Sequence, residues 1–321
     1  MVVAIFHLLG YNETKKVKSQ FDNSILGKRG KTMLTKEEFQ NLLAKGPLIL
    51  DGATGSNLQK MGMPKGCCTE EWILMNPEAL VKLQHAYEAA GSNIVYAPTF
   101  QAQPIALERV NLQRQTEAIN AQLVALSRSA APGCLIAGDL TTLATFCDSW
   151  DEANFDLLVE NYRRQIRGLI DGGADLLVGE TLLYPQEAEA ILTAAELEGA
   201  GASMYTFTMQ PDGSLFSGRD AAPVLRELES LGAAAVGFNC VAADMMTPHL
   251  VSKLRRYLKG PLICKPNAGV PVIGSDGIPY YPQTPDEFAS IVKTCHENGA
   301  HILGGCCGTA PEYIKELADI L

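Results

Sequence analysis

The sequence predicts an α/β protein made of a single (β/α)8 barrel, a TIM barrel, with an N-terminal extension. Three observations lead to this prediction. A short apolar run, a bend and a helix-period segment follow one another eight times along the chain. The apolar runs are nearly continuous, which is typical of parallel strands that helices cover. The eight units fill about 275 residues, and this is the usual size of such a barrel.

The first 33 residues lack this pattern. Residues 1–33 show no sustained period and carry a lysine-rich patch. We interpret them as a loosely ordered extension, or as a segment upstream of a true start at Met33. The barrel domain is therefore assigned to 34–321.

The domain opens with a helix signal. Thr35 and Glu38 have the spacing of a capping box, because the threonine can accept an N–H bond while the glutamate reaches back to the cap. A short amphipathic helix should follow as far as Lys45.

The expected strands then come in order. They are the apolar runs at 47–51, 93–97, 134–139, 174–180, 204–209, 234–240, 261–265 and 301–306. Several of the helical segments between them end in glycine, as helices often do. The main alternative is a doubly wound open sheet, but its first turn should read Gly-x-Gly-x-x-Gly. The turn at 51–56 reads Asp-Gly-Ala-Thr-Gly-Ser, which favours the barrel.

Composition excludes several classes of protein. Lys and Arg total 26 against 36 Asp and Glu, a net charge of −10, and such a chain is a poor nucleic-acid binder. No apolar run approaches the roughly 18 residues of a membrane span. The apolar start has no preceding basic residues and no cleavage site, so a secretory signal is not expected. These observations predict a cytoplasmic protein without nucleic-acid or membrane partners.

Polar residues recur where the expected strands end. In a (β/α)8 barrel the carboxyl ends of the strands carry the active site. Each of these residues alone could simply cap the next helix. Thiols and carboxylates gathered at one rim indicate a functional site instead, and the residues are Asp51, Thr99, Asp139, Glu180, Asn239, Cys240, Lys265, Asn267, Cys306 and Cys307.

Three of the nine cysteines fit a metal site. Cys306 and Cys307 lie between Gly305 and Gly308, so the chain can turn and aim both sulfurs at one point. With Cys240 they give three thiolates, a set that suits Zn²⁺. Three protein ligands leave one position open, which is typical of a catalytic site.

The other cysteines leave an alternative open. Cys67 and Cys68 follow the first strand at the same rim and could supply a fourth sulfur, which would close the site into a structural one. The role of Cys147 stays open. Packing is the expected role of Cys134, Cys264 and Cys295.

Other common chemistries lack their residues. None of the five histidines follows a strand end, and the sequence has neither a G-x-S-x-G elbow nor a phosphate-binding G-x-x-x-x-G-K loop. Lys265 could form a Schiff base if it were desolvated, although pairing with a rim carboxylate is the more frequent fate of such a lysine. A Schiff-base lyase that uses Lys265 is therefore an alternative of another class.

Six motifs together resemble one known family. The resemblance spans roughly residues 46–321, and the motifs occur in the order found in the zinc-dependent homocysteine S-methyltransferases. They are DGATGSNL (51–58), APTF (97–100), GET (179–181), GFNC (237–240), KPNAG (265–269) and GGCCGTAPE (304–312).

The resemblance implies a role for each matching residue. It implies Cys240, Cys306 and Cys307 as the zinc ligands and catalytic residues. The substrate's ammonium would be held by Asp51 and Glu180, and its carboxylate by the backbone at Gly55 and Ser56. Thr99 is assigned to the same substrate site, and Asn267 to the fourth zinc position when substrate is absent.

The wording of the last two motifs is most similar to the homocysteine-binding module of cobalamin-dependent methionine synthase. We expect the folate and cobalamin modules of that synthase to be missing here. The resemblance therefore implies methylcobalamin on a separate corrinoid protein as methyl donor. A small donor such as betaine or S-methylmethionine is one alternative, and a non-catalytic zinc barrel subunit is another. The Gly-Cys-Cys at 66–68 departs from the family pattern.

The chemistry explains why such residues are needed. A free thiol has a pKa near ~8.5 and is mostly protonated at neutral pH. A thiol that coordinates zinc loses its proton, so homocysteine would be bound as the nucleophilic thiolate and methylated to methionine. This reaction needs no proton relay, which agrees with the absence of rim histidines.

Overall fold

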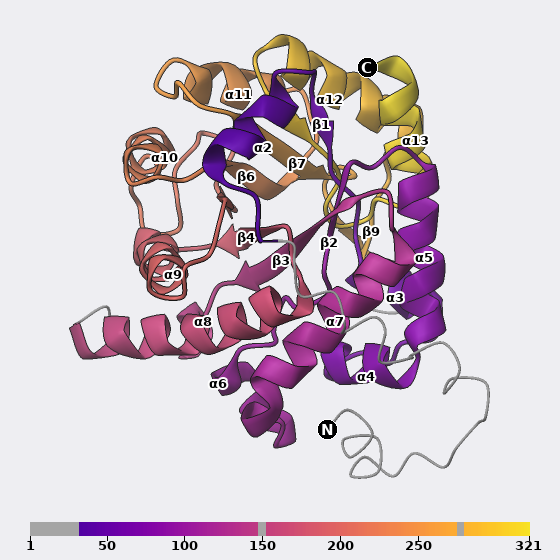
Figure 1. Ribbon diagram of the computed structural model, residues 1–321. Coiled ribbons are helices and arrows are strands. Elements are labelled where there is room, and N and C mark those ends of the chain that lie inside the picture. Colours follow the sequence, from indigo (N-terminus) through magenta and orange to yellow (C-terminus); the bar gives the residue numbers. More distant parts are fainter. Residues whose placement is uncertain (1–31, 147–151, 275–278) are drawn as a thin grey trace. The chain divides into compact units, whose positions relative to one another are not determined.

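The computed structural model of the chain describes residues 32–146, 152–274 and 279–321. Their main feature is an eight-stranded parallel sheet surrounded by helices (Figure 1). The extension predicted at 1–33 lies outside these residues except for its last two positions. In the described part, no helix is long and apolar enough to cross a membrane.

Each predicted apolar run overlaps one strand of the barrel sheet, and several strands extend by one or two residues beyond the predicted bounds. The strands are β1 (Leu48–Ile49), β2 (Ile94–Tyr96), β3 (Leu135–Thr141), β4 (Leu176–Leu182), β5 (Ser203–Phe207), β6 (Ala235–Ala242), β7 (Leu262–Asn267) and β10 (Ile302–Leu303). All pair in parallel, in the order β1-β10-β7-β6-β5-β4-β3-β2. A parallel bridge between Leu50 and Ile94 joins the first and last strands of this order. The sheet therefore curls into a barrel, and the barrel prediction is confirmed over the open sheet.

Helices cover the outside of this barrel, and several begin with proline, which suits the first helical turn. The helices are α2 (Lys36–Leu43), α3 (Gly55–Lys60), α4 (Thr69–Met75), α5 (Pro77–Ala89), α6 (Pro104–Leu107), α7 (Thr116–Ala130), α8 (Glu152–Gly172), α9 (Pro185–Leu197), α10 (Ala221–Ser230), α11 (Thr247–Arg255), α12 (Pro285–Glu297) and α13 (Pro311–Ile320). After β7, the strands β8 (Val272–Ile273) and β9 (Pro279–Tyr280) form a small antiparallel sheet that the sequence did not predict.

The N-terminal end of the barrel is closed by α2. The predicted capping box is present, with Glu38 N donating to Thr35 Oγ1 at 3.1 Å and Thr35 N donating to Glu38 Oε2 at 2.8 Å. The helix ends at Leu43, slightly before the predicted Lys45. Phe39 is fully buried and packs with apolar residues of the barrel interior, among them Leu48, Ile94, Met204 and Ile302.

The opposite end of the barrel carries irregular strands. The pairing register shifts in β4 between Gly179 and Leu182, and in β6 between Asn239 and Ala242. Both shifts lie where polar residues replace the apolar run. A register shift turns the chain locally and re-aims its side chains, so these two strands have the freedom to direct residues inward. Cys134, Cys264 and Cys295 are buried, as expected for core residues.

Candidate functional site

A cavity of about 420 Å³ opens at the carboxyl ends of the strands, as in other (β/α)8 barrels. Its walls come from the carboxyl-end residues of β2, β3, β4, β6 and β7 and from the loops after β1, β2 and β10. The lining residues that carry chemistry are Asp51, Gly55, Ser56, Glu70, Tyr96, Asp139, Glu180, Thr181, Cys240, Lys265, Cys306 and Cys307. The cavity therefore brings thiols and carboxylates together in one space.

Three thiols converge on one side of this cavity. Cys306 Sγ lies 3.3 Å from Cys240 Sγ, and Cys240 Sγ lies 3.7 Å from Cys307 Sγ. All three sulfurs lie within 4.8 Å of one another. Sulfurs bound tetrahedrally to zinc at ~2.3 Å would be about 3.8 Å apart. The triad therefore fits a zinc ion, with one position of the tetrahedron left to another ligand.

The backbone at Cys240 explains how its sulfur reaches the others. Cys240 has a φ of 56° and Thr181 a φ of 58°, and both lie at the register shifts of their strands. Residues other than glycine seldom adopt this left-handed conformation, and it tends to persist only where surrounding contacts hold it.

Asn239 supplies such contacts. Its Oδ1 accepts from Thr181 N at 3.0 Å, and its Nδ2 donates to Thr181 Oγ1 at 2.6 Å and to Cys306 Sγ at 3.6 Å. Asn239 is fully buried. One side chain therefore connects both irregular strands with the thiol triad, a role that the sequence alone did not reveal.

The turn at Cys306 and Cys307 is held from several sides. Cys306 N donates to Pro266 O at 2.7 Å, and Thr309 Oγ1 donates to Cys306 O at 2.7 Å. A Cβ at Gly305 would lie 2.4 Å from Thr309 Oγ1, so only glycine fits beside that hydroxyl. Gly308 has a φ of +83°, which also favours glycine. Both glycines are therefore needed for this turn.

The thiols share charge unequally. Hydrogen bonds from Cys240 and Cys306 lower the pKa of Cys307 to about 3. The contacts with Cys306 and Cys307, together with burial, raise the pKa of Cys240. These contacts favour the thiolate form of Cys307, and a thiolate attracts a cation.

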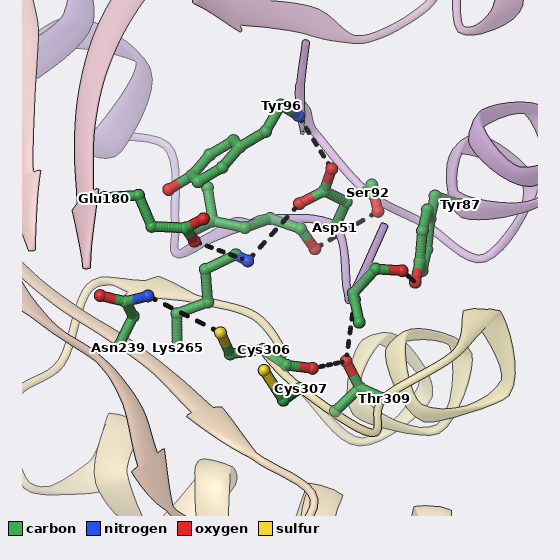
Figure 2. Close-up of polar contacts among 12 residues, drawn as sticks. Asp51, Tyr87, Ser92, Tyr96, Glu180, Asn239, Lys265, Cys306, Cys307 and Thr309 are labelled. Atoms are coloured by element: carbon green, nitrogen blue, oxygen red, sulfur yellow. Dashed lines mark hydrogen bonds and ion pairs between the residues drawn. The ribbon is translucent and has the colours of Figure 1, made fainter. Parts of the chain in front are cut away.

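Carboxylates and one lysine occupy the neighbouring wall (Figure 2). Lys265 Nζ lies 3.0 Å from Glu180 Oε1 and 3.9 Å from Asp51 Oδ1. The same ammonium lies 4.8 Å from the centre of the Tyr96 ring. Tyr96 N in turn donates to Asp51 Oδ2 at 2.8 Å. Lys265 therefore pairs with rim carboxylates, as expected for most lysines at such a position.

Burial and charge determine the protonation of this group. Burial alone lowers the pKa of Lys265, but the charges of Glu180, Cys306 and Asp51 outweigh it and hold that pKa well above its ordinary value. Burial raises the pKa of Asp51 to about 7, against the opposing effect of Lys265. A Schiff base needs the neutral amine, so the contacts of Lys265 oppose the lyase alternative.

Comparisons with known proteins identify the family of the chain. The profile of the family described as "Homocysteine S-methyltransferase" matches residues 48–321. The chain belongs to this family. The match begins at β1 and includes every strand of the barrel.

Individual relatives differ in length. The chain is 26% identical over 300 residues to a methionine synthase of Mycobacterium leprae, and this covers 86% of the chain but 24% of that protein. The methionine synthase of Mycobacterium tuberculosis is likewise 26% identical over 297 residues, 25% of its length. The chain thus spans about a quarter of these synthases. Homocysteine S-methyltransferase YbgG of Bacillus subtilis is 29% identical over 318 residues, 96% of its length.

A solved structure supports the fold. The metallated form of the homocysteine methyltransferase MmuM from Escherichia coli superposes with a TM-score of 0.76 at 24% identity. The match covers 88% of this chain and 99% of that one.

The remaining residues expected for the family lie at or next to the cavity. Gly55 and Ser56 line it at the start of α3, where backbone N–H groups lack partners within the helix. Thr99 is fully buried, and its hydroxyl donates to Asp139 O at 2.8 Å. Asn267 Oδ1 accepts from Cys307 N at 3.0 Å. The structure thus gives Thr99 and Asn267 positioning contacts, and their roles toward substrate and zinc stay predictions.

Cys67 and Cys68 stand apart from the triad. Cys67 is exposed, and Cys68 Sγ donates to Glu70 Oε2 at 3.4 Å. Burial and the Glu70 carboxylate raise the pKa of Cys68 to about 12. Among the described residues, the group found that could hold a metal ion consists of Cys240, Cys306 and Cys307. This disfavours a closed four-thiolate site; Cys147 lies outside the described residues.

Proposed function

We propose that this protein is a zinc-dependent methyltransferase that converts homocysteine to methionine with a methyl group from a corrinoid protein. The observation that carries the proposal is the convergence of three thiols within 4.8 Å of one another at the wall of a cavity. The same cavity is lined by the carboxylates of Asp51 and Glu180. Family membership and the fit of the sulfur spacing to zinc both support it.

The thiol triad would hold the metal, and the carboxylates would bind the substrate. Cys240, Cys306 and Cys307 would hold zinc, which keeps a coordinated substrate thiol deprotonated. The homocysteine sulfur then forms a bond to the methyl carbon as the bond between that carbon and the donor breaks. The thiol proton is released to solvent, so no basic side chain is required.

The amino-acid end of the substrate would be fixed by charge. Asp51 and Glu180 line the cavity beside Lys265 and would accept bonds from the substrate ammonium. Backbone N–H groups at Gly55 and Ser56 would bind its carboxylate. Charge-assisted hydrogen bonds of this kind orient the sulfur toward the methyl donor and reduce the entropy cost of the reaction.

A protein donor is supported by the apolar rim of the barrel. The loops after β6 and β7 and the short strand β8 expose Met245, Met246, Val270, Val272 and Ile273, with Met245 84% exposed. Large exposed apolar side chains near a site often mark a protein interface. The long methionine synthase relatives also support a donor carried on protein. A small donor is the second candidate, because YbgG matches this chain over 96% of its own length.

A donor panel tests the proposal. Zinc-loaded protein is incubated with homocysteine and either methylcobalamin, S-methylmethionine or betaine, and methionine is measured. We expect methionine from methylcobalamin, and none from a variant with Cys240, Cys306 and Cys307 all changed to alanine. Methionine from a small donor alone would replace the corrinoid with the second candidate. An active triple variant would refute the zinc mechanism.

The alternatives of other classes have tests of their own. A lyase would be trapped on Lys265 by borohydride in the presence of a carbonyl substrate, and we expect no trapping. A scaffold with closed zinc would bind no homocysteine. The cytoplasmic location stays a prediction.

A further inference from the structure

One carboxyl group in the cavity has no partner of its own. Asp139 lies near the carboxyl end of β3, lines the cavity and is 4% exposed. Its Oδ1 atom is buried and accepts no hydrogen bond. Among the described residues, the ion pairs of the cavity join Lys265 with Asp51 and Glu180 and leave Asp139 out. A buried acceptor without a donor is costly, so this atom calls for a donor from outside the chain.

The backbone of Asp139, in contrast, is held firmly. Its N–H donates to Thr99 Oγ1 at 3.1 Å, and its carbonyl accepts from Thr99 Oγ1 at 2.8 Å and from Gln165 Nε2 at 3.1 Å. Gln165 Nε2 also donates to Thr99 O at 2.7 Å. Thr99 and Gln165 are both fully buried. These bonds fix the backbone that carries the carboxyl group. Such support is expected for a residue that binds a ligand.

The charges of the cavity favour a cation as that ligand. Four carboxyl groups, those of Asp51, Glu70, Asp139 and Glu180, line the cavity together with the ammonium of Lys265. Glu70 already accepts from Gln101 N and from Cys68 Sγ. Lys265 lies 3.0 Å from Glu180 and 3.9 Å from Asp51, so it already offsets part of their charge. Burial and the Glu180 charge raise the pKa of Asp139 well above its ordinary value, so an adjacent ammonium is needed to stabilise its carboxylate form. A second cation that enters the cavity would find Asp139 without an ion-pair partner in the described part of the chain.

We infer that Asp139 is a third carboxylate that binds the α-ammonium of the acceptor thiol and selects amino thiols over thiols without an amine. This inference rests on the proposed function. Lys265 occupies the space beside Asp51 and Glu180, so the substrate ammonium is shared with Asp139 rather than held by the first two carboxylates alone.

The test compares two thiols on zinc-loaded protein. Homocysteine and 4-mercaptobutanoate have the same thiol and carboxylate, and only homocysteine has the amine. In Asp139→Asn we expect homocysteine affinity to fall about 10- to 100-fold, the loss typical of a charge-assisted bond, with 4-mercaptobutanoate affinity unchanged. Isothermal titration measures both. Asp171→Asn, which removes an exposed carboxylate on α8, is the matched control.

The outcomes separate the inference from the proposed function. Unchanged homocysteine affinity in Asp139→Asn, or an equal loss for both thiols at full zinc content, would overturn the inference while the wild-type protein still binds homocysteine. A wild-type protein that binds no homocysteine would overturn the proposed function as well. Asp139→Ser repeats the comparison with a smaller side chain if the asparagine variant does not hold zinc.

Discussion

Asn239 joins two strained backbone positions to a sulfur of the triad, and its effect on zinc can be measured directly. Asn239→Ala removes the bonds to Thr181 and Cys306 Sγ. We expect zinc affinity to fall about 10- to 100-fold, as for other residues that support metal ligands. Competition with a chromophoric chelator gives the affinity.

A graded variant serves as comparison for this prediction. Thr181→Val removes the hydroxyl that accepts from Asn239 Nδ2 but keeps the backbone N–H that donates to Asn239 Oδ1. The loss of zinc affinity should therefore be smaller. Equal zinc affinity in Asn239→Ala and the wild-type protein would contradict the role assigned to Asn239.

Asp51 gives a prediction on pH. Its pKa is about 7 in the folded protein, above the ordinary value of 3.8. The fold thus favours the protonated carboxyl, and this contribution to the unfolding free energy declines as the pH rises from 3.8 toward about 7. An ammonium, however, is attracted only by the carboxylate. Binding of methionine, which has no thiol proton to lose, should strengthen as the pH rises through about 7.

Fluorescence or calorimetric titration of methionine between pH 6 and pH 8 measures this dependence, in steps of about half a unit. In Asp51→Asn the dependence should disappear and the binding weaken. A flat profile in the wild-type protein would show that Asp51 does not contact the ammonium.

Residues with a strand-end position and a motif could be predicted from sequence. Cys240, Cys306 and Cys307 were selected this way, and the structure brings their sulfurs together. Asp139 and Asn239 were also noted at strand ends, and Asn239 lies in the GFNC motif, but neither residue was given a role by its position. Their importance depends on a missing partner and on contacts across the barrel, which arise only in the folded protein.

At the level of elements, β6 depends on close approach to β7. A Cβ at Gly237 would lie 2.1 Å from Ile263 O, a backbone atom that cannot rotate away. Gly237→Ala should therefore separate the two strands and lower the unfolding free energy by about 3 kcal/mol. Because Cys240 follows on the same strand, zinc affinity should fall as well.

Urea unfolding measures the effect. Gly133→Ala is the matched control, because its Cβ would meet only the movable carboxylate of Glu88, and its unfolding free energy should stay near that of the wild type. If the two variants were equally stable, the close approach of β6 and β7 would not be the reason for glycine at position 237.

The strands could be predicted as elements, but their irregularities could not. Continuous apolar runs mark all the strands of the barrel sheet. The register shifts in β4 and β6, and the pairing of β8 with β9, follow from cross-strand contacts. Such contacts leave no periodic signal within one strand, so hydrophobic patterns do not reveal them.

On the scale of the whole barrel domain, stability and chemistry lie at opposite ends. Phe39 closes the N-terminal end and packs with the barrel interior, whereas the thiols lie at the carboxyl ends. Phe39→Ala should lower the unfolding free energy by about 3–5 kcal/mol through the cavity it leaves. Zinc content of the folded protein should not change. A loss of zinc at full folding would contradict this separation.

The architecture itself was the most predictable feature. Eight alternating units at the expected length leave few arrangements of a parallel sheet. The bridge between Leu50 and Ile94 joins the two edges of the sheet and closes the barrel. The sequence predicts this closure only through the number of repeated units, because no local pattern marks the bridge.

X-ray absorption at the zinc edge of the loaded protein, with and without homocysteine, tests the central claim most directly. Three sulfurs and one lighter ligand should be seen without substrate, and a fourth sulfur near ~2.3 Å should replace the lighter ligand when homocysteine is added. A zinc coordination sphere that is the same in both samples would show that the thiol triad does not present an open position to the substrate, and would contradict the proposed chemistry.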